Sequence, residues 1–428
     1  MSGRLRLFDS RRQKLVPFRP ANRTATLYVC GITPYDTTHL GHAFTYTSFD
    51  VLVRYLEWRG IGVRYVQNVT DVDDDILRHA RERGEDWLRL GNRWTRRFID
   101  DLEALNVRPP DLYTRATDAI PQIIAMIQVL LERGLAYARG GSVYYRSAGT
   151  AFGSLSHLPA GEWLRVASDR GNDPADPNKE QPLDSVLWQA AAPGEPAWPS
   201  PWGPGRPGWH IECASMATHY LGPCVDIHGG GADLAFPHHE SEAAQAAAYT
   251  GVRPFARYWL HTAMVHFQGQ KMSKSLGNLV MVCHLLADHA PDALRLYLAS
   301  HRYRDSWGYD PAGLQRLAAI AGRWQAAAAR EGAAAPPEAA RRARSQFAAA
   351  MDDDLDTPRA LGALAALAEA ILAAPARSGC AGVAQETLRE LAGVLGLRLG
   401  QSGPEPRVVA GWAAHKARFP VLTLGQGP

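Results

Sequence analysis

Hydrophobic positions near the start of the chain predict a strand, a loop and a helix, in that order. Residues 27–31 read LYVCG, a short apolar run that ends in glycine, and a turn-rich stretch follows it. From residue 49 to residue 56, apolar side chains recur at positions i, i+3, i+4 and i+7, which is the spacing of one buried helical face. The segment HLGH at residues 39–42 therefore lies where the strand edge meets the start of a helix.

The next apolar run predicts a second strand, parallel to the first. Residues 62–69 read GVRYVQNV, so strand, helix and strand form one parallel unit, which is half of a nucleotide-binding α/β sheet. The acidic run TDVDDD at residues 70–75 follows at the carboxyl edge, where open parallel sheets bind ligands. Its carboxylates suit either a divalent-ion site or a capped helix start, with Asp71 or Asp73 as the cap.

The remaining patterns predict several further parts. A candidate β-hairpin lies around Phe8 and Leu15, helical periodicity weakens at about residues 136–184, and the chain is helical and alanine-rich after residue 283. We expect an α/β fold in which a parallel sheet is split by an insertion and followed by a helical bundle. The expected parts are two sheet halves at 1–110 and 201–282, a connective insertion at 111–200, a helical bundle at 283–400 and a short tail at 401–428.

Composition adds few constraints on partners. Among 428 residues, 46 Lys and Arg stand against 43 Asp and Glu, so no strong overall field indicates a nucleic-acid partner, although a local patch can still bind one. The amino-terminal stretch lacks the apolar core of a signal peptide, and no apolar run reaches membrane-spanning length, which predicts a cytoplasmic location and no membrane partner. The five cysteines are scattered, which favours reduced thiols, some of them on a metal, over a disulfide framework.

Two polar motifs suit the phosphates of a nucleotide. His39 and His42 flank Gly41 at a helix start, where unpaired N–H groups and the helix dipole favour an anion. Taken alone this motif is weak, because two histidines at a helix start can serve only as hydrogen-bonding groups. In the later segment KMSKS, Lys271 and Lys274 lie in a polar loop flanked by glycine, and their charges suit a developing pyrophosphate.

A glycine run after a later strand suits the nucleoside. The strand at residues 225–228 ends in Gly229, Gly230 and Gly231, which allow a backbone to pack closely against adenosine. Asp233 then follows and is free to bind a ribose or an amino group. A plain flexible turn is the alternative interpretation of the same residues.

HLGH and KMSKS, in that order, resemble the two signatures of class I aminoacyl-tRNA synthetases. The flanking segments VCGITPYDTTHLGH, YVQNVTDVDDDI, PGWHIECASM, DIHGGGADLAFPHHE and KMSKSLGN are similar to the cysteinyl-tRNA synthetase family, together with its close relative, the cysteine ligase of mycothiol biosynthesis. The resemblance extends from about residue 27 to about residue 367. It implies a Rossmann-like catalytic sheet, an insertion, a helical bundle and the activation of cysteine.

The resemblance also implies a zinc site. Cys30, Cys213, His238 and Glu242 occupy the positions at which the family carries its zinc ligands, and His238 and Glu242 are four residues apart, so both project from one helical face. Two thiolates, an imidazole and a carboxylate are a plausible zinc set. Zinc prefers a soft thiolate to a hydroxyl, which separates cysteine from serine, a pair that pocket shape discriminates poorly.

The roles of the remaining site residues follow from the same resemblance. Thr70 and Trp209 are expected to contact the bound cysteine, next to Cys30, although a tryptophan at such a position is often only a core residue. ATP with Mg²⁺ is the expected co-substrate, with His39 and His42 at its phosphates and the two lysines of KMSKS at the leaving pyrophosphate.

The acceptor of the cysteinyl group stays open between two candidates. Glu242, the DIH segment before the glycine run and Leu276 favour tRNA(Cys), which we take as the first candidate. The ITP segment before HLGH, the RGNDP loop at residues 170–174, residues 279–280 and a short tail favour the amine of glucosaminyl-inositol. Two other classes of protein fit the sequence less well. In a nucleotidyltransferase, Cys30 and Cys213 would have no role in a shared metal site, and a non-catalytic binding protein would not need intact HLGH and KMSKS. A monomer is the default expectation.

Overall fold

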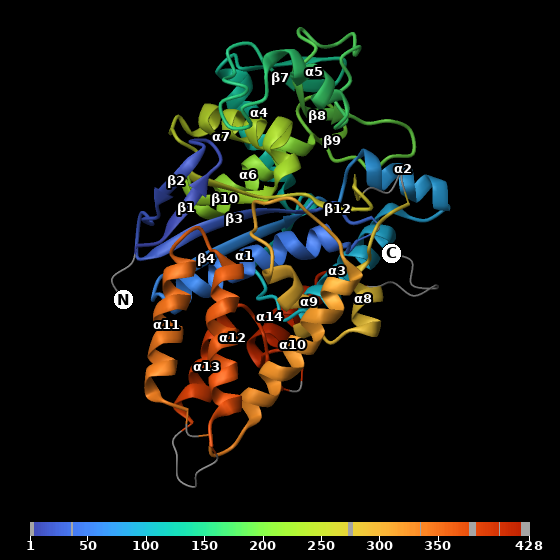
Figure 1. Ribbon diagram of the computed structural model, residues 1–428. Coiled ribbons are helices and arrows are strands. Elements are labelled where there is room, and N and C mark those ends of the chain that lie inside the picture. The colour runs from blue at the N-terminus through green and yellow to red at the C-terminus, as the bar shows by residue number, and fades with distance from the viewer. Residues whose placement is uncertain are drawn as a thin grey trace.

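A five-stranded parallel sheet forms the centre of the computed structural model, which describes residues 4–35, 37–272, 277–333, 335–375, 382–401 and 403–420 (Figure 1). The strand order is β11–β10–β3–β4–β5. The strands are β3 (Thr24–Ile32), β4 (Gly62–Val69), β5 (Leu112–Arg115), β10 (Val225–Gly231) and β11 (Ala256–Thr262). The predicted strands at 27–31 and 62–69 are therefore confirmed, as is the α/β class.

The order of the strands creates a switch point beside β3. The chain leaves β3 to form β4 on one side, and β10 pairs with β3 in parallel on the other side. At such a reversal, the loops after neighbouring strands diverge and leave a crevice at the carboxyl ends, where ligands bind. The HLGH segment follows β3 directly, so it lies at this crevice.

Side chains of β3 alternate between two hydrophobic cores, one on each face of the sheet. Leu27 and Val29 belong to the core shared with α1 (Leu40–Trp58) and the helical region, whereas Tyr28 and Cys30 belong to the core shared with α4 (Ile120–Glu132) and α6 (Trp209–Leu221). This alternation follows from the two-residue period of a strand. It directs Cys30 towards α6.

The insertion forms a smaller sheet with its own helices, drawn at the top of Figure 1. Its antiparallel strands have the order β6 (Ala136–Arg139), β7 (Ser142–Tyr145), β8 (Ser185–Ala190) and β9 (Gly205–Pro207). Helix α5 (Ala160–Ser168) lies between β7 and β8 in sequence. The antiparallel hairpin of β1 (Arg6–Asp9) and β2 (Lys14–Pro17) pairs Phe8 with Leu15, as predicted.

Short elements connect the sheet to the helical region. The strands β12 (Val265–Phe267), β13 (Gln270–Lys271) and β14 (Trp307–Gly308) form a small sheet after β11. The single-turn and short elements are η1 (Thr117–Ala119), η2 (Ala232–Leu234) and η3 (Ala235–His239), followed by α7 (Glu240–Thr250). Helices α2 (Asp74–Arg83) and α3 (Trp87–Ala104) follow β4.

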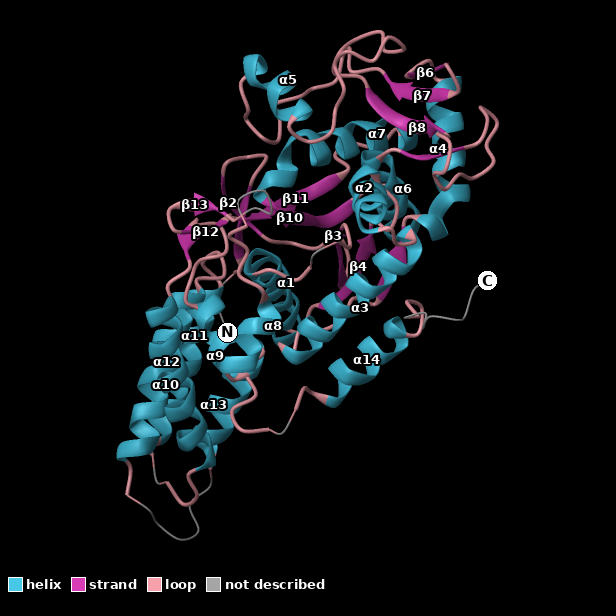
Figure 2. Cartoon of the chain, turned by 90° about the vertical axis from the view of Figure 1, so that its right-hand side faces the viewer, coloured by secondary structure: helices cyan, strands magenta, loops and turns pink. Residues whose placement is uncertain are grey.

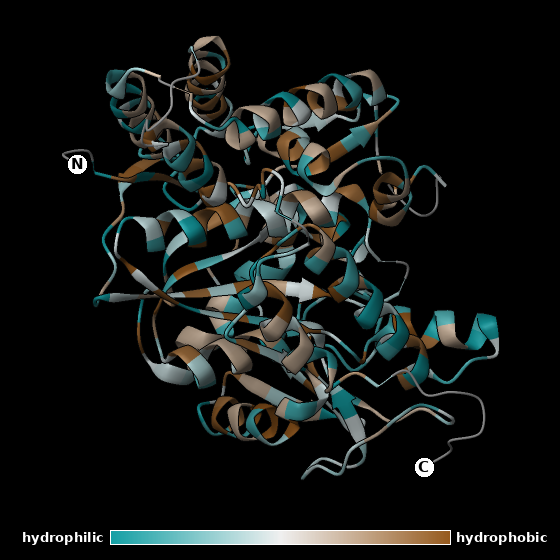
Figure 3. Ribbon diagram, turned by 90° about the horizontal axis from the view of Figure 1, so that it is seen from below, coloured by the Kyte–Doolittle hydropathy of each residue, from teal (hydrophilic) through white to brown (hydrophobic). Residues whose placement is uncertain are grey.

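The carboxyl-terminal third is helical. Helices α10 to α13 pack together below the sheet in Figure 1, and α14 runs back beside α3 in Figure 2. These helices are α8 (Val282–Asp288), α9 (Pro291–Ala299), α10 (Pro311–Ala329), α11 (Pro337–Met351), α12 (Thr357–Ala373), α13 (Val383–Val394) and α14 (Pro406–Lys416). Most helices in Figure 3 carry both hydrophobic and hydrophilic stretches, as expected for helices with one buried face. Within the described residues, no helix has the length and apolarity needed to cross a bilayer. The residue limits predicted for the parts of the chain stay a prediction.

Candidate active site

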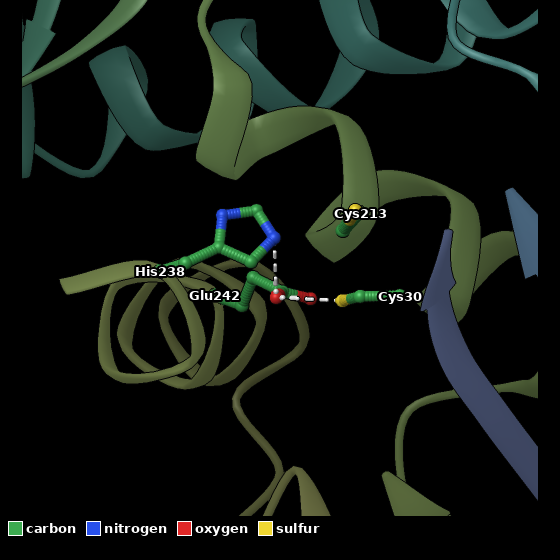
Figure 4. Close-up of side chains that lie close together, drawn as sticks. All are labelled: Cys30, Cys213, His238 and Glu242. Carbon is green, nitrogen blue, oxygen red and sulfur yellow. Dashed lines mark hydrogen bonds and ion pairs between the residues drawn. The ribbon is translucent and has the colours of Figure 1, made fainter. Parts of the chain in front are cut away.

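Four buried side chains from three separate segments meet between β3, α6 and the start of α7 (Figure 4). Cys30 comes from β3, Cys213 from the first turns of α6, His238 from η3 and Glu242 from α7. One potential ligand atom from each of the four lies within 4.8 Å of the others. The structure thus brings together the whole set of metal ligands that the resemblance implied.

Glu242 is the centre of the hydrogen bonds in this cluster. Its Oε1 lies 3.0 Å from His238 Nε2 and accepts from the Cys30 thiol at 3.4 Å. Its Oε2 lies 3.0 Å from His228 Nε2. Because both oxygens have partners, the carboxylate is fixed in orientation although it is fully buried.

The cluster favours the charged forms of its thiol and carboxylate. Burial alone would raise the pKa of Cys213, but the Cys30 thiol and His238 lower it to about 6. Burial would likewise raise the pKa of Glu242, and the neighbouring imidazoles of His228 and His238 hold it well below its usual range. The pKa of Cys30 stays well above its usual range because of burial and of Cys213. A single thiolate is therefore the form that the cluster itself stabilises, and a cation would be needed to ionise both thiols.

The donor set fits a zinc ion. Thiolate, imidazole and carboxylate are zinc ligands, and His210 Nδ1 lies 2.9 Å from His238 Nδ1, leaving His238 Nε2 for the metal. The ring of Trp209 stacks on that of His238 with centroids 4.3 Å apart, which fixes the imidazole plane. When bound there, zinc would supply affinity for a substrate thiolate.

Further histidines surround this cluster, and the sequence interpretation did not include them. Cys30 also groups with His228 and His239 as potential ligands. His239 Nδ1 lies 2.8 Å from His261 Nε2, and His261 Nδ1 lies 2.7 Å from the hydroxyl of Ser10 in the amino-terminal hairpin turn. These contacts join residues far apart in sequence, so no local spacing could have indicated them.

The HLGH segment forms the start of α1. His39 is the N-cap, and its Nδ1 accepts from the backbone N–H groups of Gly41 at 3.1 Å and His42 at 3.4 Å. The rings of His39 and His42 are stacked, with centroids 3.7 Å apart. His39 thus does have the capping role that was the simpler interpretation. The cap uses the Nδ1 atom of the ring.

The chain that follows the KMSKS loop pairs with HLGH. Leu40 N donates to Val280 O at 2.8 Å, and Val282 N donates to Thr38 O at 2.9 Å, around an antiparallel bridge between His39 and Met281. The backbone of Lys271 belongs to β13, and the lysine side chain and Lys274 lie outside the described atoms. The described residues that follow the second signature are therefore adjacent to the first.

The glycine run at the end of β10 permits close packing, but part of that packing is internal. A Cβ at Gly229 would lie 2.3 Å from the ring of Phe49 on α1, and one at Gly230 would lie 2.9 Å from Leu234. Gly231, whose φ is −66°, is half-buried and precedes η2. Adenosine binding by these glycines stays a prediction.

Asp233 meets the insertion. Arg170, in the loop after α5, donates to Asp233 Oδ2 at 3.1 Å, and both side chains are 28% exposed. The RGNDP loop, singled out in the sequence for another reason, therefore contacts the residue expected to bind the nucleoside. The charge of Arg170 is thereby paired with that of Asp233.

The acidic run after β4 has structural partners. Asp73 caps α2 by accepting from Ile76 N at 2.9 Å, so the capping interpretation is confirmed for that residue. Asp71 accepts from the backbone N–H and the hydroxyl of Thr117. Burial raises the pKa of Asp73 to about 7 and that of Asp71 to about 6. Thr70, also buried, accepts from Asn68 Nδ2 at 3.3 Å.

Two buried glutamates beside the candidate metal ligands were not predicted. Glu212 precedes Cys213 on α6, and burial, followed by Cys213, raises the pKa of Glu212 well above its usual range. Glu240, between His238 and Glu242, accepts from the backbone N–H groups and hydroxyl of the insertion turn at residues 153–156. The contacts of Glu240 lie in a distant segment, and the burial of Glu212 depends on tertiary packing, which explains why spacing along the chain gave no signal.

The chain belongs to the class I tRNA synthetases, because the model of the class I (C) catalytic domain matches residues 18–318 and a DALR domain matches residues 346–400. It is therefore a ligase of an ATP-using family. A methionyl-tRNA synthetase of Mycobacterium tuberculosis, solved with methionyl-adenylate, has the same fold, with a TM-score of 0.61 at 17% identity over 87% of this chain and 88% of that one.

Its curated relatives include cysteine ligases of two kinds. The L-cysteine:1D-myo-inositol 2-amino-2-deoxy-alpha-D-glucopyranoside ligase of Frankia casuarinae is 48% identical over 380 residues, 88% of this chain and 81% of the relative. The enzyme with the same name from Frankia alni is 49% identical over 352 residues, 82% of this chain and 84% of the relative. The cysteine–tRNA ligase of Dehalococcoides mccartyi is 42% identical over 400 residues, 92% of this chain and 86% of the relative.

Proposed function

We propose that this chain activates L-cysteine with ATP and transfers the cysteinyl group to an acceptor. In the first step the carboxylate of cysteine attacks the α-phosphorus of ATP, which forms cysteinyl-adenylate and releases pyrophosphate. In the second step an acceptor nucleophile attacks the carbonyl of the adenylate, and AMP leaves. The observation that carries the proposal is the convergence of Cys30, Cys213, His238 and Glu242 at the edge of the sheet where HLGH begins α1.

The chain's own groups have simple roles in this scheme. Cys30, Cys213, His238 and Glu242 would hold zinc, which supplies affinity for the thiolate of the substrate. The imidazoles of His39 and His42 at the start of α1 would contact the phosphates, because the first backbone N–H groups of this helix already donate to His39 Nδ1 and Val280 O. Positioning and fixed dipoles, rather than a covalent enzyme intermediate, would provide the acceleration.

The acceptor that we propose first is the amine of a glucosaminyl-inositol. The cationic side chains on and beside α14 support it, because each of them already forms an ion pair. Most of these pairs attach α14 to the catalytic domain, and one lies within the start of α14. The ion pairs are Arg407 with Glu57 and Glu405, Lys416 with Asp100 and Glu103, and Arg418 with Asp118. Binding of tRNA draws much of its affinity from Lys and Arg side chains placed on phosphates. A small amine needs no such surface.

The cysteinyl group would then end in an amide. The neutral amine attacks the adenylate carbonyl, the bond to AMP breaks, and one proton leaves the nitrogen. The names of the Frankia relatives are in accord with this acceptor. This order of the two candidates reverses the one that the sequence favoured.

Transfer to tRNA(Cys) is the second candidate. It is favoured by the relative from Dehalococcoides mccartyi, which aligns with 92% of this chain, and by the carboxylate at Glu242, which the sequence resemblance associates with the tRNA ligase. Incubation with ATP and labelled cysteine, with glucosaminyl-inositol in one series and tRNA in the other, separates the candidates. Label in the aminosugar alone supports the first candidate, and label in tRNA alone refutes it.

Activation itself is tested by cysteine-dependent exchange between pyrophosphate and ATP. We expect Cys213→Ser to lose most of the bound zinc and the exchange, because a hydroxyl is a poor zinc ligand. Cys224→Ser is the matched control, since Cys224 is a free, half-buried thiol outside the cluster and should keep about one zinc per chain. Unchanged zinc content in Cys213→Ser would refute the ligand set, and no exchange in the zinc-loaded wild type would refute activation.

A further inference from the structure

Within the part of the chain that the structure describes, a buried carboxyl group beside the candidate metal cluster has no cationic partner. Glu212 is fully buried on the first turn of α6, and neither of its oxygens has a hydrogen-bond partner of normal geometry among the described residues. The charged groups that act on it most strongly, Cys213, Asp71 and Asp73, are all acidic, and Thr70 contributes a hydroxyl. Buried carboxylates in proteins are normally paired with a cation or fully hydrogen-bonded. Among the described residues, the ionised form of Glu212 therefore lacks a positive partner.

The position of Glu212 on α6 directs it towards the candidate substrate pocket. Trp209, Glu212 and Cys213 have the spacing i, i+3 and i+4, so they lie on one face of the helix. Trp209 stacks on His238, and Cys213 belongs to the metal cluster. Because α6 packs against β3 and β4, this face meets the strand ends that carry Cys30 and Thr70.

The missing positive group has the chemistry of an amino acid's ammonium. In cysteine, three bonds separate the sulfur from the α-nitrogen, so the two atoms are roughly 3 to 4 Å apart. A sulfur held at the cluster of Cys213 therefore carries its ammonium to the neighbourhood of the residue next to Cys213. An ammonium has three N–H donors, and the carboxylate of Glu212 and the hydroxyl of Thr70 are both acceptors.

We propose that Glu212, together with Thr70, binds the α-ammonium of the substrate and so makes the enzyme require an amino acid rather than any thiol carboxylic acid. This inference rests on the proposed activation of cysteine. The metal cluster binds the sulfur atom of the substrate, whereas Glu212 binds its α-nitrogen. A thiol acid without the amine would leave the buried carboxylate without its partner, which costs binding energy.

The test compares L-cysteine with 3-mercaptopropionate, which has the same thiol and carboxylate but no amine. Pyrophosphate exchange gives kcat/KM for each compound, and their ratio is the preference for the ammonium. We expect Glu212→Gln to lower this ratio by about 10- to 100-fold, the effect of losing a hydrogen bond between charged groups. A change that only perturbs packing would reduce both values and leave the ratio unchanged. Because the exchange needs no acceptor, the effect cannot come from an acceptor amine.

Glu195→Gln is the matched control, since Glu195 is a largely buried glutamate paired with Arg81 and Arg206. Its ratio should equal that of the wild type. If Glu212→Gln does not fold, Thr70→Val provides the test, because it removes the second acceptor and should also lower the ratio. A wild-type ratio in Glu212→Gln, or in Thr70→Val where that variant replaces it, overturns the inference while activation stands. No exchange with cysteine in the wild type overturns the proposed function and the inference with it.

Discussion

A buried ionic cluster joins the catalytic sheet to the helical region, and it yields a quantitative prediction. Asp50 on α1 accepts from Arg54 Nε at 3.0 and 2.9 Å, from Arg108 N at 2.8 Å and from Arg295 on α9. The Asp50 side chain is 0% exposed, and those of Arg54 and Arg295 are 2% and 1% exposed. Arg295 also donates to Leu395 O and Leu105 O, so the cluster reaches the end of α13.

We predict that Asp50→Asn lowers the free energy of unfolding by about 3 to 5 kcal/mol, the usual cost of leaving a buried charge without its partner. The substituted amide keeps the size of the side chain, but it places N–H donors near two guanidinium groups. Since whole domains are stable by only about 5 to 15 kcal/mol, the loss is a large fraction of the total. Urea denaturation followed by tryptophan fluorescence would measure it.

Asp353→Asn is the matched control for this prediction. Asp353 pairs with Arg6 and Arg359, but its side chain is 35% exposed. An exposed pair contributes about 0 to 1 kcal/mol, so the control should stay within that range. If Asp50→Asn costs no more than Asp353→Asn, burial does not determine the value of these pairs and the reasoning is wrong.

Two further predictions concern α1 and the carboxyl-terminal segment. His39→Asn should keep the free energy of unfolding within about 0.5 kcal/mol of the wild-type value, because asparagine also caps helices well. The rate of pyrophosphate exchange should fall at least about tenfold. An unchanged rate would show that His39 serves only as a cap. Partial burial would raise the pKa of Glu405, but the Arg54 guanidinium lowers it to about 2, below the unfolded value of about 4.3. The stabilisation from Glu405 should thus be complete above about pH 4.5 and be lost as the pH falls towards 2. The difference in urea midpoint between the wild type and Glu405→Gln should therefore shrink over that range. A difference that stays constant with pH would contradict the prediction.

The strands and helix starts could be predicted because their signals are local. The period of the apolar residues indicated β3, α1 and β4, and the acidic run indicated a cap at Asp71 or Asp73, of which Asp73 caps α2. The spacing of His238 and Glu242 also predicted that their side chains share a helical face, and His238 Nε2 lies 3.0 Å from Glu242 Oε1. Each of these features depends on residues within one or two turns of chain.

The contacts that could not be predicted all depend on tertiary packing. The glycine run was interpreted as a surface for adenosine, yet the space above Gly229 is filled by Phe49, which lies 180 positions earlier. Glu212 and Glu240 gave no signal because a glutamate in a helix is ordinarily a surface residue. Their burial follows from the packing of α6 on the sheet and of the insertion on α7.

The start of α7 connects the metal cluster with the insertion. His238 and Glu242 contact one another in the cluster, whereas Glu240 accepts from backbone N–H groups of Gly153, Leu155 and Ser156. A buried carboxylate that accepts several N–H groups is costly to displace, since each group would be left without a partner. These hydrogen bonds therefore attach the insertion turn to the segment that carries His238 and Glu242.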